Sequence, residues 1–385
     1  MSLTQRAQAQ LSAFSPKAGK FYAQWRNYDY GQGHHSAVSG LSPYVRRRIL
    51  HEREVIARIR TQHSFADSEK FIQEVFWRTY WKGWLEHRPL IWQDYSAGLS
   101  ADHRAVANDP AAARLYHDVT HGACDIACMN EWSTELRQTG YLHNHARMWF
   151  ASIWVFTLGL PWRLGAQFFW RNLHDGDAAS NTLSWRWVAG LQTVGKHYVA
   201  TPQNITKFTD GRHHPNALNT HATALNGAPH PAPIPPDLPR VVEHPNRYGL
   251  LVHEEDMTTA PYRPEARAIL CPPLAPQHHR ATHVQTQIDA GLTERAGPDA
   301  PRLQTAAQIA AWAQQSALSD IVMRYLPQGP LRDAIDGWGA ALAQDGITLH
   351  IDTDPYDALC WPYATKGFFA FKKNIPQFLT HLEQT

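Results

Sequence analysis

Hydrophobic residues recur every three or four positions through much of the first half of the chain. The clearest stretches are "EKFIQEVFWRTYWKGWLEH" and "ELRQTGYLHNHARMWFASIWVF", which fall within residues 44–95 and 127–171. This spacing places apolar side chains on one face of a helix, and it predicts that the first part of the chain is all-α. Gly140 interrupts the second stretch, so we expect one helix to end there and the next to begin near Tyr141.

The pattern changes after about Thr209. Six prolines lie between Gly227 and Pro239, and such a segment is expected to be an extended linker or to wrap a surface. Beyond it, the apolar runs "RYGLLVHEEDM", "ARAILCPP", "DIVMRYL" and "ITLHIDT" alternate with helical patterns at "TAAQIAAWAQQSAL" and "GPLRDAIDGWGAALAQDG". Alternating strands and helices favour a mostly parallel sheet. The predicted fold is therefore mainly α: a helical domain over residues 1–212, a proline-rich linker over 213–245 and a smaller α/β domain over 246–385.

Charge is distributed unevenly along the 385 residues. Residues 1–212 hold 24 Lys and Arg against 17 Asp and Glu, and the remainder holds 12 against 17. A positive excess in the first part suits a polyanion partner. The start of the chain lacks the apolar core of a secretory signal, and no run reaches the roughly 20 apolar residues that span a bilayer. These features predict a cytoplasmic protein with no membrane partner.

Cysteine spacing gives no sign of a disulfide framework or a metal site. The four cysteines are scattered, and Cys124 and Cys128, four residues apart, have no matching second pair. The segment "GQGHHS" at 31–36 imitates a dinucleotide-binding fingerprint weakly, but no buried strand precedes it. No metal and no Rossmann-type site are predicted.

The stretch "LHDGDAASNTLSWRWVAG", residues 173–190, combines carboxylates, an amide and two tryptophans. Taken alone, the "DGD" would be an ordinary loop and a tryptophan would be a core residue. Together with "TGYLHNHARM" and "PWRLG" upstream, however, it resembles the FAD-binding core of the DNA photolyase and cryptochrome family, whose pattern runs TGWMHNRxRM, WR.GE and DGDxAxNxxxWxW in that order. The segments "SGLSPYV", "EVFWRTYW" and "TPQNITKFTDG" also match, so the resemblance covers about residues 20–212.

The resemblance implies a noncovalent, U-shaped FAD in the helical domain. Arg147 would pair with Asp175 beside the isoalloxazine, Asp177 would meet the ring edge or the ribityl side, and Asn181 would face flavin N5. Ser42 and Pro43 are expected to form an N-cap followed by a first-turn proline, and the free N–H groups of such a helix end bind phosphate. The cofactor-binding residues implied are Tyr22, Ser39, Leu41, Ser42, Asn144, Arg147, Asp175, Asp177 and Asn181.

The same resemblance implies a path for electrons and a site for damaged DNA. Trp185 would be the tryptophan nearest the flavin and Trp162 the second, with Trp92 one candidate for the outermost. The basic residues Arg46, Arg47, Arg48 and Arg78 are expected to line the rim and to hold DNA phosphates. The residues that would meet a flipped cyclobutane dimer are Glu74, Trp77, Asn144, His145, Met148 and Trp187.

The predicted function is light-driven repair of cyclobutane pyrimidine dimers by electron transfer from photoexcited reduced FAD, as in a deoxyribodipyrimidine photolyase. Two alternatives stay open: a cryptochrome-like blue-light photoreceptor without repair, and a DNA-binding or scaffold protein whose pocket has decayed. The chain departs from the family pattern, because Leu183 and Ser184 replace a Gly-Gly pair, Arg48 replaces a glycine, and no α/β antenna domain precedes the FAD core. A second antenna chromophore and the role of the C-terminal α/β domain are left open.

Overall fold

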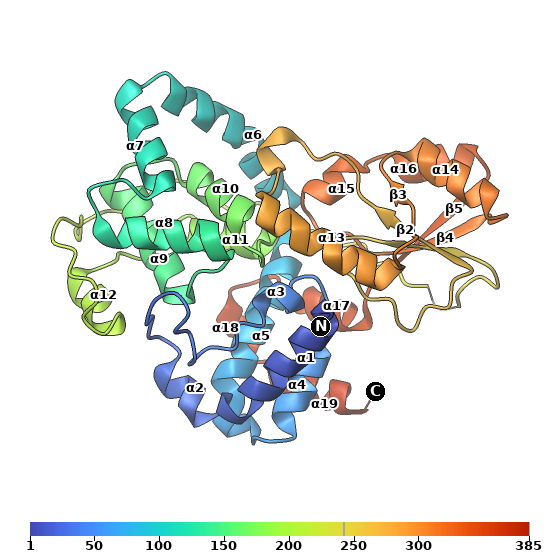
Figure 1. The fold of residues 1–385 in the computed structure, drawn as a ribbon, viewed down its shortest axis with the longest axis horizontal. Helices are drawn as coiled ribbons and strands as arrows, with labels where there is room; N and C mark the ends of the chain where they lie inside the picture. The colour runs from blue at the N-terminus through green and yellow to red at the C-terminus, as the bar shows by residue number, and fades with distance from the viewer. Residues whose placement is uncertain (242, 385) are drawn as a thin grey trace.

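The computed structural model describes residues 1–241 and 243–384 and has a large helical part beside a smaller lobe built on a sheet (Figure 1). This matches the predicted fold class. The helices of the first part are α1 (Leu3–Phe14), α2 (Lys20–Trp25), α3 (Ser42–Val45), α4 (Glu52–Arg60), α5 (Phe65–Glu86), α6 (Pro89–Ala107), α7 (Pro110–His121), α8 (Ala127–Thr139), α9 (Asn144–Ser152), α10 (Trp162–Asn172), α11 (Ala178–Val188) and α12 (Pro202–Phe208). A short π-helical turn, Ile153–Thr157, continues α9.

Gly140 ends α8, as its position in the sequence predicts. It adopts φ 67°, the left-handed conformation that glycine reaches without a steric penalty. The next helix, α9, begins at Asn144 rather than near Tyr141. The reason is the cap: His143 accepts a hydrogen bond from the backbone N–H of His145 through Nδ1, at 3.2 Å, which fixes the first turn.

The proline-rich segment carries no helix or strand between residues 213 and 240, and parts of it lie along the helical domain. The backbone N–H of Ile234 donates to the carbonyl of His87 at 2.8 Å. Arg88, at the start of α6, donates to the carbonyl of Pro231 at 3.2 Å. The segment therefore wraps a surface, one of the two arrangements that its composition predicts.

The sheet is parallel throughout its five strands, in the order β3-β2-β1-β4-β5. Alternate residues of β1 face opposite layers: Leu250 packs into the core that includes α1 and α13, and Leu251 into the core that includes α14 and α16. The elements are β1 (Gly249–Val252), β2 (Ala266–Leu270), β3 (Arg302–Leu303), β4 (Asp320–Arg324) and β5 (Thr348–Asp352), with α13 (Thr282–Ala296), α14 (Ala306–Gln315), α15 (Pro330–Ala334) and α16 (Trp338–Gln344).

The last helices leave the sheet and complete the core of the helical domain. They are α17 (Pro355–Cys360), α18 (Phe368–Lys372) and α19 (Ile375–Gln384). The rings of Phe371 and Phe378 are fully buried against Phe76 of α5, with centroids 6.3 and 5.9 Å away. The α/β unit predicted for 246–385 thus ends at β5, because the aromatic residues that follow belong to the helical core.

Three consecutive arginines join the two parts of the chain. Arg46, Arg47 and Arg48 follow α3 and are 0, 1 and 5% exposed. Their partners are acidic residues of the α/β part and of α17: Arg46 pairs with Glu255 at 2.7 Å, Arg47 with Glu254 at 2.5 Å, and Arg48 with Asp256 at 2.8 Å and with Asp357 of α17 at 2.7 Å. The prediction that these arginines line a DNA-binding rim is wrong, because buried and paired guanidinium groups cannot reach phosphates.

This cluster of ion pairs occupies a characteristic place in the sheet. Residues 254–256 directly follow β1, next to the point where the strand order changes direction between β1 and β4. In open parallel sheets that crevice, at the carboxyl ends of the strands, commonly holds a ligand. Here the arginines of the helical domain fill it. Part of the positive excess of residues 1–212 is therefore neutralised inside the molecule.

Candidate functional site

A cavity of about 600 Å³ lies between α2, α5, α9 and α11 and gathers the residues singled out in the sequence. Of the predicted cofactor-binding and lesion-binding residues and the two inner tryptophans of the electron path, all but Trp162 line it. The predicted residues that line it are Tyr22, Ser39, Leu41, Ser42, Glu74, Trp77, Asn144, His145, Arg147, Met148, Asp175, Asp177, Asn181, Trp185 and Trp187. Segments far apart in the sequence therefore meet at one cavity, as the motif spacing implies.

Asp175 is buried in the cavity wall beside two arginines. Its Oδ2 lies 3.1 Å from Nη1 of Arg147 and 3.6 Å from Nη2 of Arg78. Burial alone would raise the pKa of this carboxyl, but the two guanidinium groups and a hydrogen bond from Ser42 hold its pKa below the usual value. Asp175 is thus a carboxylate at neutral pH, and the predicted Arg147–Asp175 pair is present.

Both carboxylate oxygens of Asp177 have partners within the protein. Its Oδ1 accepts the backbone N–H of Ser180 at 2.7 Å and so caps α11. Its Oδ2 lies 3.6 Å from Arg46, 3.8 Å from Arg78 and 3.9 Å from Lys82. Burial would raise the pKa of Asp177, but these cations lower it well below its usual value.

Lys82 is a residue that the sequence analysis missed. Its ammonium group is buried at 5% exposure beside Asp177. The sequence does contain a feature that indicates its position: Lys82 lies four residues after Arg78 in α5, on the same helix face. A lysine among the aromatic residues of a buried helix needs a carboxylate partner, and the "DGD" stretch supplies it.

Several polar atoms around the cavity are inaccessible to solvent and have no hydrogen-bond partner. They are Oδ1 of Asp175, Oγ of Ser180 and Nε1 of Trp185. Each buried polar group without a partner costs free energy, so such groups in one cavity wall point to a ligand that pairs with them. A flavin dinucleotide carries ring N–H groups, carbonyls, hydroxyls and phosphates. The residues present therefore fit FAD.

The region around Ser42 differs in detail from the prediction. Ser42 is the first residue of α3 rather than its N-cap; Leu41 is the cap and makes no side-chain bond. The helix has only four residues, and the chain then turns at Arg48, whose φ of 52° is left-handed. This conformation explains why a glycine suits that position in the family pattern. Ser39 Oγ accepts the N–H of Leu41 at 3.3 Å.

Asn181 presents one end of its amide to the protein. Its Nδ2 donates to the carbonyl of Ala166 at 2.7 Å, which leaves Oδ1 as the group that can meet a ligand. An amide oxygen accepts a hydrogen bond and cannot supply a proton. Asn181 is thus suited to accept from a flavin N–H.

Aromatic and acidic residues also line the cavity. Trp77 stacks on Phe368 of α18 with centroids 3.6 Å apart, and Trp187 stacks on Tyr198 at 5.8 Å. Glu74 forms a close ion pair with Arg26, which lowers its pKa, while burial, the larger effect, raises it overall. Phe368 was not anticipated, because the sequence gives no sign that α18 returns to α5.

The two tryptophans predicted to be the inner members of the electron path have different neighbours. Trp185 is in edge-on contact with Trp154, with centroids 6.1 Å apart, and Gly165 leaves room for it, since a Cβ there would lie 2.3 Å from the indole. Trp162 lies beside Tyr95, with Arg163 and Arg186 at 5.3 and 5.9 Å from its ring. Neighbouring cations disfavour a positively charged, oxidised indole.

Trp92 does not fit the outermost position of an electron path. It is 1% exposed, and its indole N–H donates to Asp333 of α15 at 2.8 Å. An outermost member must reach solvent. The interpretation of Trp92 as the surface end is therefore wrong, and this tryptophan is a core residue.

Two histidines at the start of α9 are held in the neutral form, and one of them, His145, lines the cavity. Burial lowers the pKa of His143 to about 3 and that of His145 to about 4. His145 packs between Trp149 and Phe208, with ring centroids 5.5 Å away in each case. Neither ring carries charge near neutral pH, so this part of the cavity is apolar and aromatic in character.

We expect the free energy of unfolding to fall as the pH is lowered from 7 to 5. A histidine with a depressed pKa in the folded state binds protons first in the unfolded state, below pH 6.5, so acid favours unfolding. Urea denaturation at the two pH values measures the fall. His145→Gln should reduce it by about 1 kcal/mol, a value discounted for partial solvent access, whereas exposed His34→Gln should leave it unchanged. An equal fall in the wild type and His145→Gln would contradict the burial argument.

Part of this chain is similar to proteins of a known family. The family model for the FAD-binding domain of DNA photolyase matches residues 71–214. A deoxyribodipyrimidine photo-lyase from Streptomyces griseus is 32% identical over 182 residues, covering 45% of this chain and 38% of that protein. Cryptochrome DASH from Idiomarina loihiensis is 28% identical over 185 residues, covering 47% and 39%. Residues 71–214 of the helical part thus match the FAD-binding domain of DNA photolyases, and the relatives named are a photolyase and a cryptochrome.

The similarity is confined to part of each protein. The chain spans about 40% of the length of the two relatives named. Among solved structures, a bacterial class III photolyase from Agrobacterium tumefaciens is similar with a TM-score of 0.44 and 25% identity, covering 54% of this chain and 42% of that one. Both photolyases and a cryptochrome are among the relatives, so this similarity leaves repair and light sensing as separate possibilities.

None of the helices in residues 1–241 and 243–384 is long and apolar enough to cross a membrane. Within the same residues, no group of three His, Cys, Asp or Glu side chains is placed to hold a metal ion.

Proposed function

We propose that this protein splits cyclobutane pyrimidine dimers in DNA by light-driven electron transfer from reduced FAD. The observation that carries the proposal is the shared cavity: Glu74, Trp77 and Trp187 line the same space as Asp175 and Asn181. A cavity that combines unpaired polar atoms with aromatic walls can take up a flavin and a flipped pyrimidine dimer together.

The flavin end is built for a polar, planar ligand. Asp175 and Ser180 would hold the cofactor through their unpaired oxygens, and Asn181 would accept from a ring N–H through Oδ1. Arg147 and Arg78 keep Asp175 ionised, so its charge persists inside the cavity. When bound and reduced, FAD supplies on excitation the electron that opens the cyclobutane ring and takes it back afterwards.

The other end is built for unstacked bases. Trp77 and Trp187 offer indole faces, and stacking on an aromatic side chain contributes about 1–3 kcal/mol per base. Phe368 supports the indole of Trp77 from behind. Glu74, whose pKa burial raises, can hydrogen-bond a base edge. Asn144, His145 and Met148 complete this wall from α9.

A blue-light photoreceptor without repair is the second candidate. The observation that favours it is the close ion pair between Arg26 and Glu74, which engages the carboxylate that a lesion would need. A photoreceptor would bind damaged and undamaged duplexes alike. Repair requires Arg26 to release Glu74, or Glu74 to contact the base while still paired.

The test is repair of a thymine-dimer oligonucleotide by chemically reduced, FAD-loaded protein under blue light, followed by the regained thymine absorbance and compared with a dark sample. We expect light-dependent repair with turnover, reduced at least about tenfold in Glu74→Ala, since a hydrogen bond to an ionisable group contributes about 1.5–3 kcal/mol. Glu69→Ala, on the same helix outside the cavity and paired with Lys372 at 3.1 Å, is the matched control. No repair by protein that holds reduced FAD would overturn the proposal and favour the photoreceptor.

A further inference from the structure

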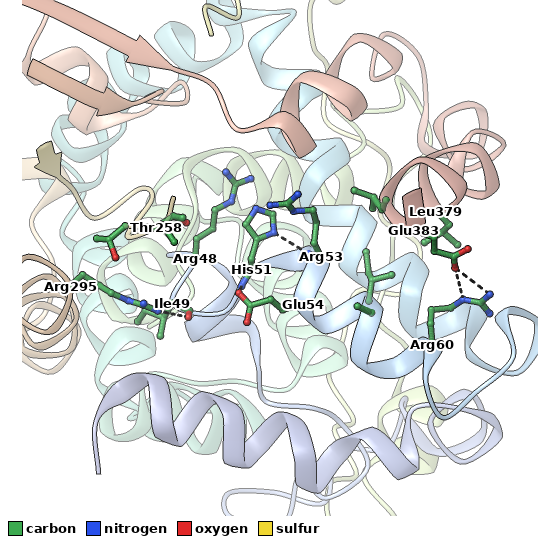
Figure 2. A pocket seen from close by; sticks show the side chains of 15 residues that line it. Arg48, Ile49, His51, Arg53, Glu54, Arg60, Thr258, Arg295, Leu379 and Glu383 are labelled. Carbon is green, nitrogen blue, oxygen red and sulfur yellow. Dashed lines mark hydrogen bonds and ion pairs between the residues drawn. The ribbon is translucent and has the colours of Figure 1, made fainter. Parts of the chain in front are cut away.

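A second cavity, of about 430 Å³, lies where α4, the loop after β1 and α19 come together (Figure 2). It is separate from the flavin cavity in its lining. One end is polar, with Thr258 and Arg295 of the α/β part, and the middle is formed by the first turn of α4 with His51 and Arg53 (Figure 2). A cavity of this size is in the range of those that bind small organic molecules.

Among the arginines that line this cavity, two have no acidic partner within the described residues, Arg53 and Arg295. Arg60 pairs with Glu383 at 3.5 Å. Arg48 pairs with Asp256 and Asp357. What remains is a negative charge on Glu54, which accepts hydrogen bonds from Gln8 and from the backbone of His51, and two arginines, Arg53 and Arg295.

Both arginines have N–H donors without a hydrogen-bond partner within the described residues. The side chain of Arg53 makes no hydrogen bond or ion pair within the described residues. Arg295 donates from Nη2 to the carbonyl of Ile49 at 2.6 Å, but its buried Nε has no partner. Oγ1 of Thr258, which is inaccessible to solvent, also has none. Arg53 is exposed, so its guanidinium is free to meet a ligand, while the buried, unpaired Nε of Arg295 and Oγ1 of Thr258 favour an acceptor. Guanidinium groups suit carboxylates.

The far end of the cavity is apolar. Its lining there includes Ile56 and Ala57 of α4 and Leu379 and Leu382 of α19. These side chains can accept a hydrocarbon or aromatic body but offer no hydrogen bond. A free phosphate would leave this end unfilled, and a neutral apolar molecule would leave the arginines unpaired.

We propose that this cavity binds an amphiphilic carboxylate, with the carboxylate between Arg53 and Arg295 and the apolar body between α4 and α19. The ligand contacts the helical domain, the α/β part and the C-terminal helix together. Binding therefore stabilises their arrangement, because a ligand that binds only the folded state raises its stability. The inference does not depend on the proposed repair function.

Calorimetric titration of decanoate into the full chain, saturated with FAD so that the flavin cavity is filled, tests the proposal. We expect one site per chain. Arg53→Gln should weaken it about tenfold, or about 1.4 kcal/mol, while Arg58→Gln, an exposed arginine of the same helix outside the cavity, should leave it unchanged. Ala57→Trp should abolish binding by filling the apolar end, with the thermal unfolding temperature of each variant reporting whether it folds.

Related small molecules distinguish the contribution of the carboxylate from that of the apolar part of the ligand. Decanol has the same chain without the carboxylate and acetate the carboxylate without the chain, so both should bind at least about tenfold more weakly than decanoate. Naphthoate reports whether a flat aromatic body is preferred to an aliphatic one. Equal weakening by Arg53→Gln and Arg58→Gln, equal affinity for decanol and decanoate, or no saturable binding of either carboxylate would overturn the proposal.

Discussion

Arg48→Met is expected to lower the free energy of unfolding by about 3–5 kcal/mol, the usual cost of removing one partner from a buried ion pair. Arg48 is surrounded by four carboxylates: Asp357 at 2.7 Å, Asp256 at 2.8 Å, Glu52 at 3.3 Å and Asp354 at 3.9 Å. Methionine fills a similar volume but leaves these charges without their central cation. The loss comes from uncompensated charge rather than from a cavity.

The pKa of Asp357 shows that Arg48 only partly offsets the burial and mutual repulsion of the carboxylates around it. Burial and the neighbouring carboxylates raise the pKa of Asp357 to about 6 even with Arg48 in place. Without the cation, the folded-state pKa values of the surrounding carboxylates rise further. A carboxyl whose pKa is raised on folding lowers the stability of the fold progressively as the pH rises from its ordinary pKa to the raised one. The effect of Arg48→Met should therefore be smaller at pH 5 than at pH 8.

Urea denaturation at pH 8 and pH 5 measures both effects. Arg58→Met is the matched control, because Arg58 is exposed on α4, and its loss should change the free energy of unfolding by less than about 0.5 kcal/mol. Arg48→Gly is a second comparison: glycine relieves the left-handed backbone at φ 52° but still removes the cation. Stability of Arg48→Met within about 1 kcal/mol of the wild type would show that the carboxylates are not held by this arginine.

The two parts of the chain are connected through residues that no local pattern could pair. Periodicity predicts the helical first part, the parallel sheet and the end of α8 at Gly140. The runs "RRR" at 46–48 and "EED" at 254–256 are both visible in the sequence, but they are about 200 residues apart. Hydrophobic spacing carries no information on such a contact, so it cannot distinguish buried arginines from arginines at a DNA-binding rim. The matching lengths of the basic and the acidic run are the sequence feature that indicates their pairing.

The flavin cavity was more predictable than the domain contacts, because its residues sit in motifs with fixed spacing. Asn144, Arg147 and Met148 lie on one face of α9, and Asp175 to Trp187 follow in a single loop and helix. The partners of these residues were less predictable. Lys82 and Ser180 have no motif of their own, and the position of Phe368 depends on where the last helices pack.

The arginine cluster and the flavin cavity are also physically continuous. Arg46 pairs with Glu255 of the α/β part and donates from Nε to the carbonyl of Gly176 at 2.9 Å. Arg280, at the start of α13, donates to the carbonyl of Trp170 at 2.8 Å. The loop that carries Asp175 and Asp177 is therefore held from behind by the α/β part, which fixes the carboxylates relative to the cavity.

Asp175→Asn is expected to weaken FAD binding about 100-fold, or about 2.7 kcal/mol. The carboxylate offers a buried, unpaired Oδ1 to the cavity, and a hydrogen bond to a charged group contributes about 1.5–3 kcal/mol. Asparagine keeps the shape of the side chain, but it removes the charge that Arg147 and Arg78 face at 3.1 and 3.6 Å. Two guanidinium groups without a carboxylate then repel one another across the cavity wall.

Quenching of flavin fluorescence on titration with protein measures the affinity, and thermal unfolding of the FAD-free protein shows whether the fold is intact. Asp102→Asn is the matched control: it removes an aspartate that pairs with Arg163 at 3.2 Å but lies outside the cavity. Its FAD affinity should stay within about twofold of the wild type. If both variants bind FAD equally well, the unpaired Oδ1 of Asp175 is not a cofactor contact. If both lose binding equally, the charge acts through the fold, because only a direct contact makes the loss specific to Asp175.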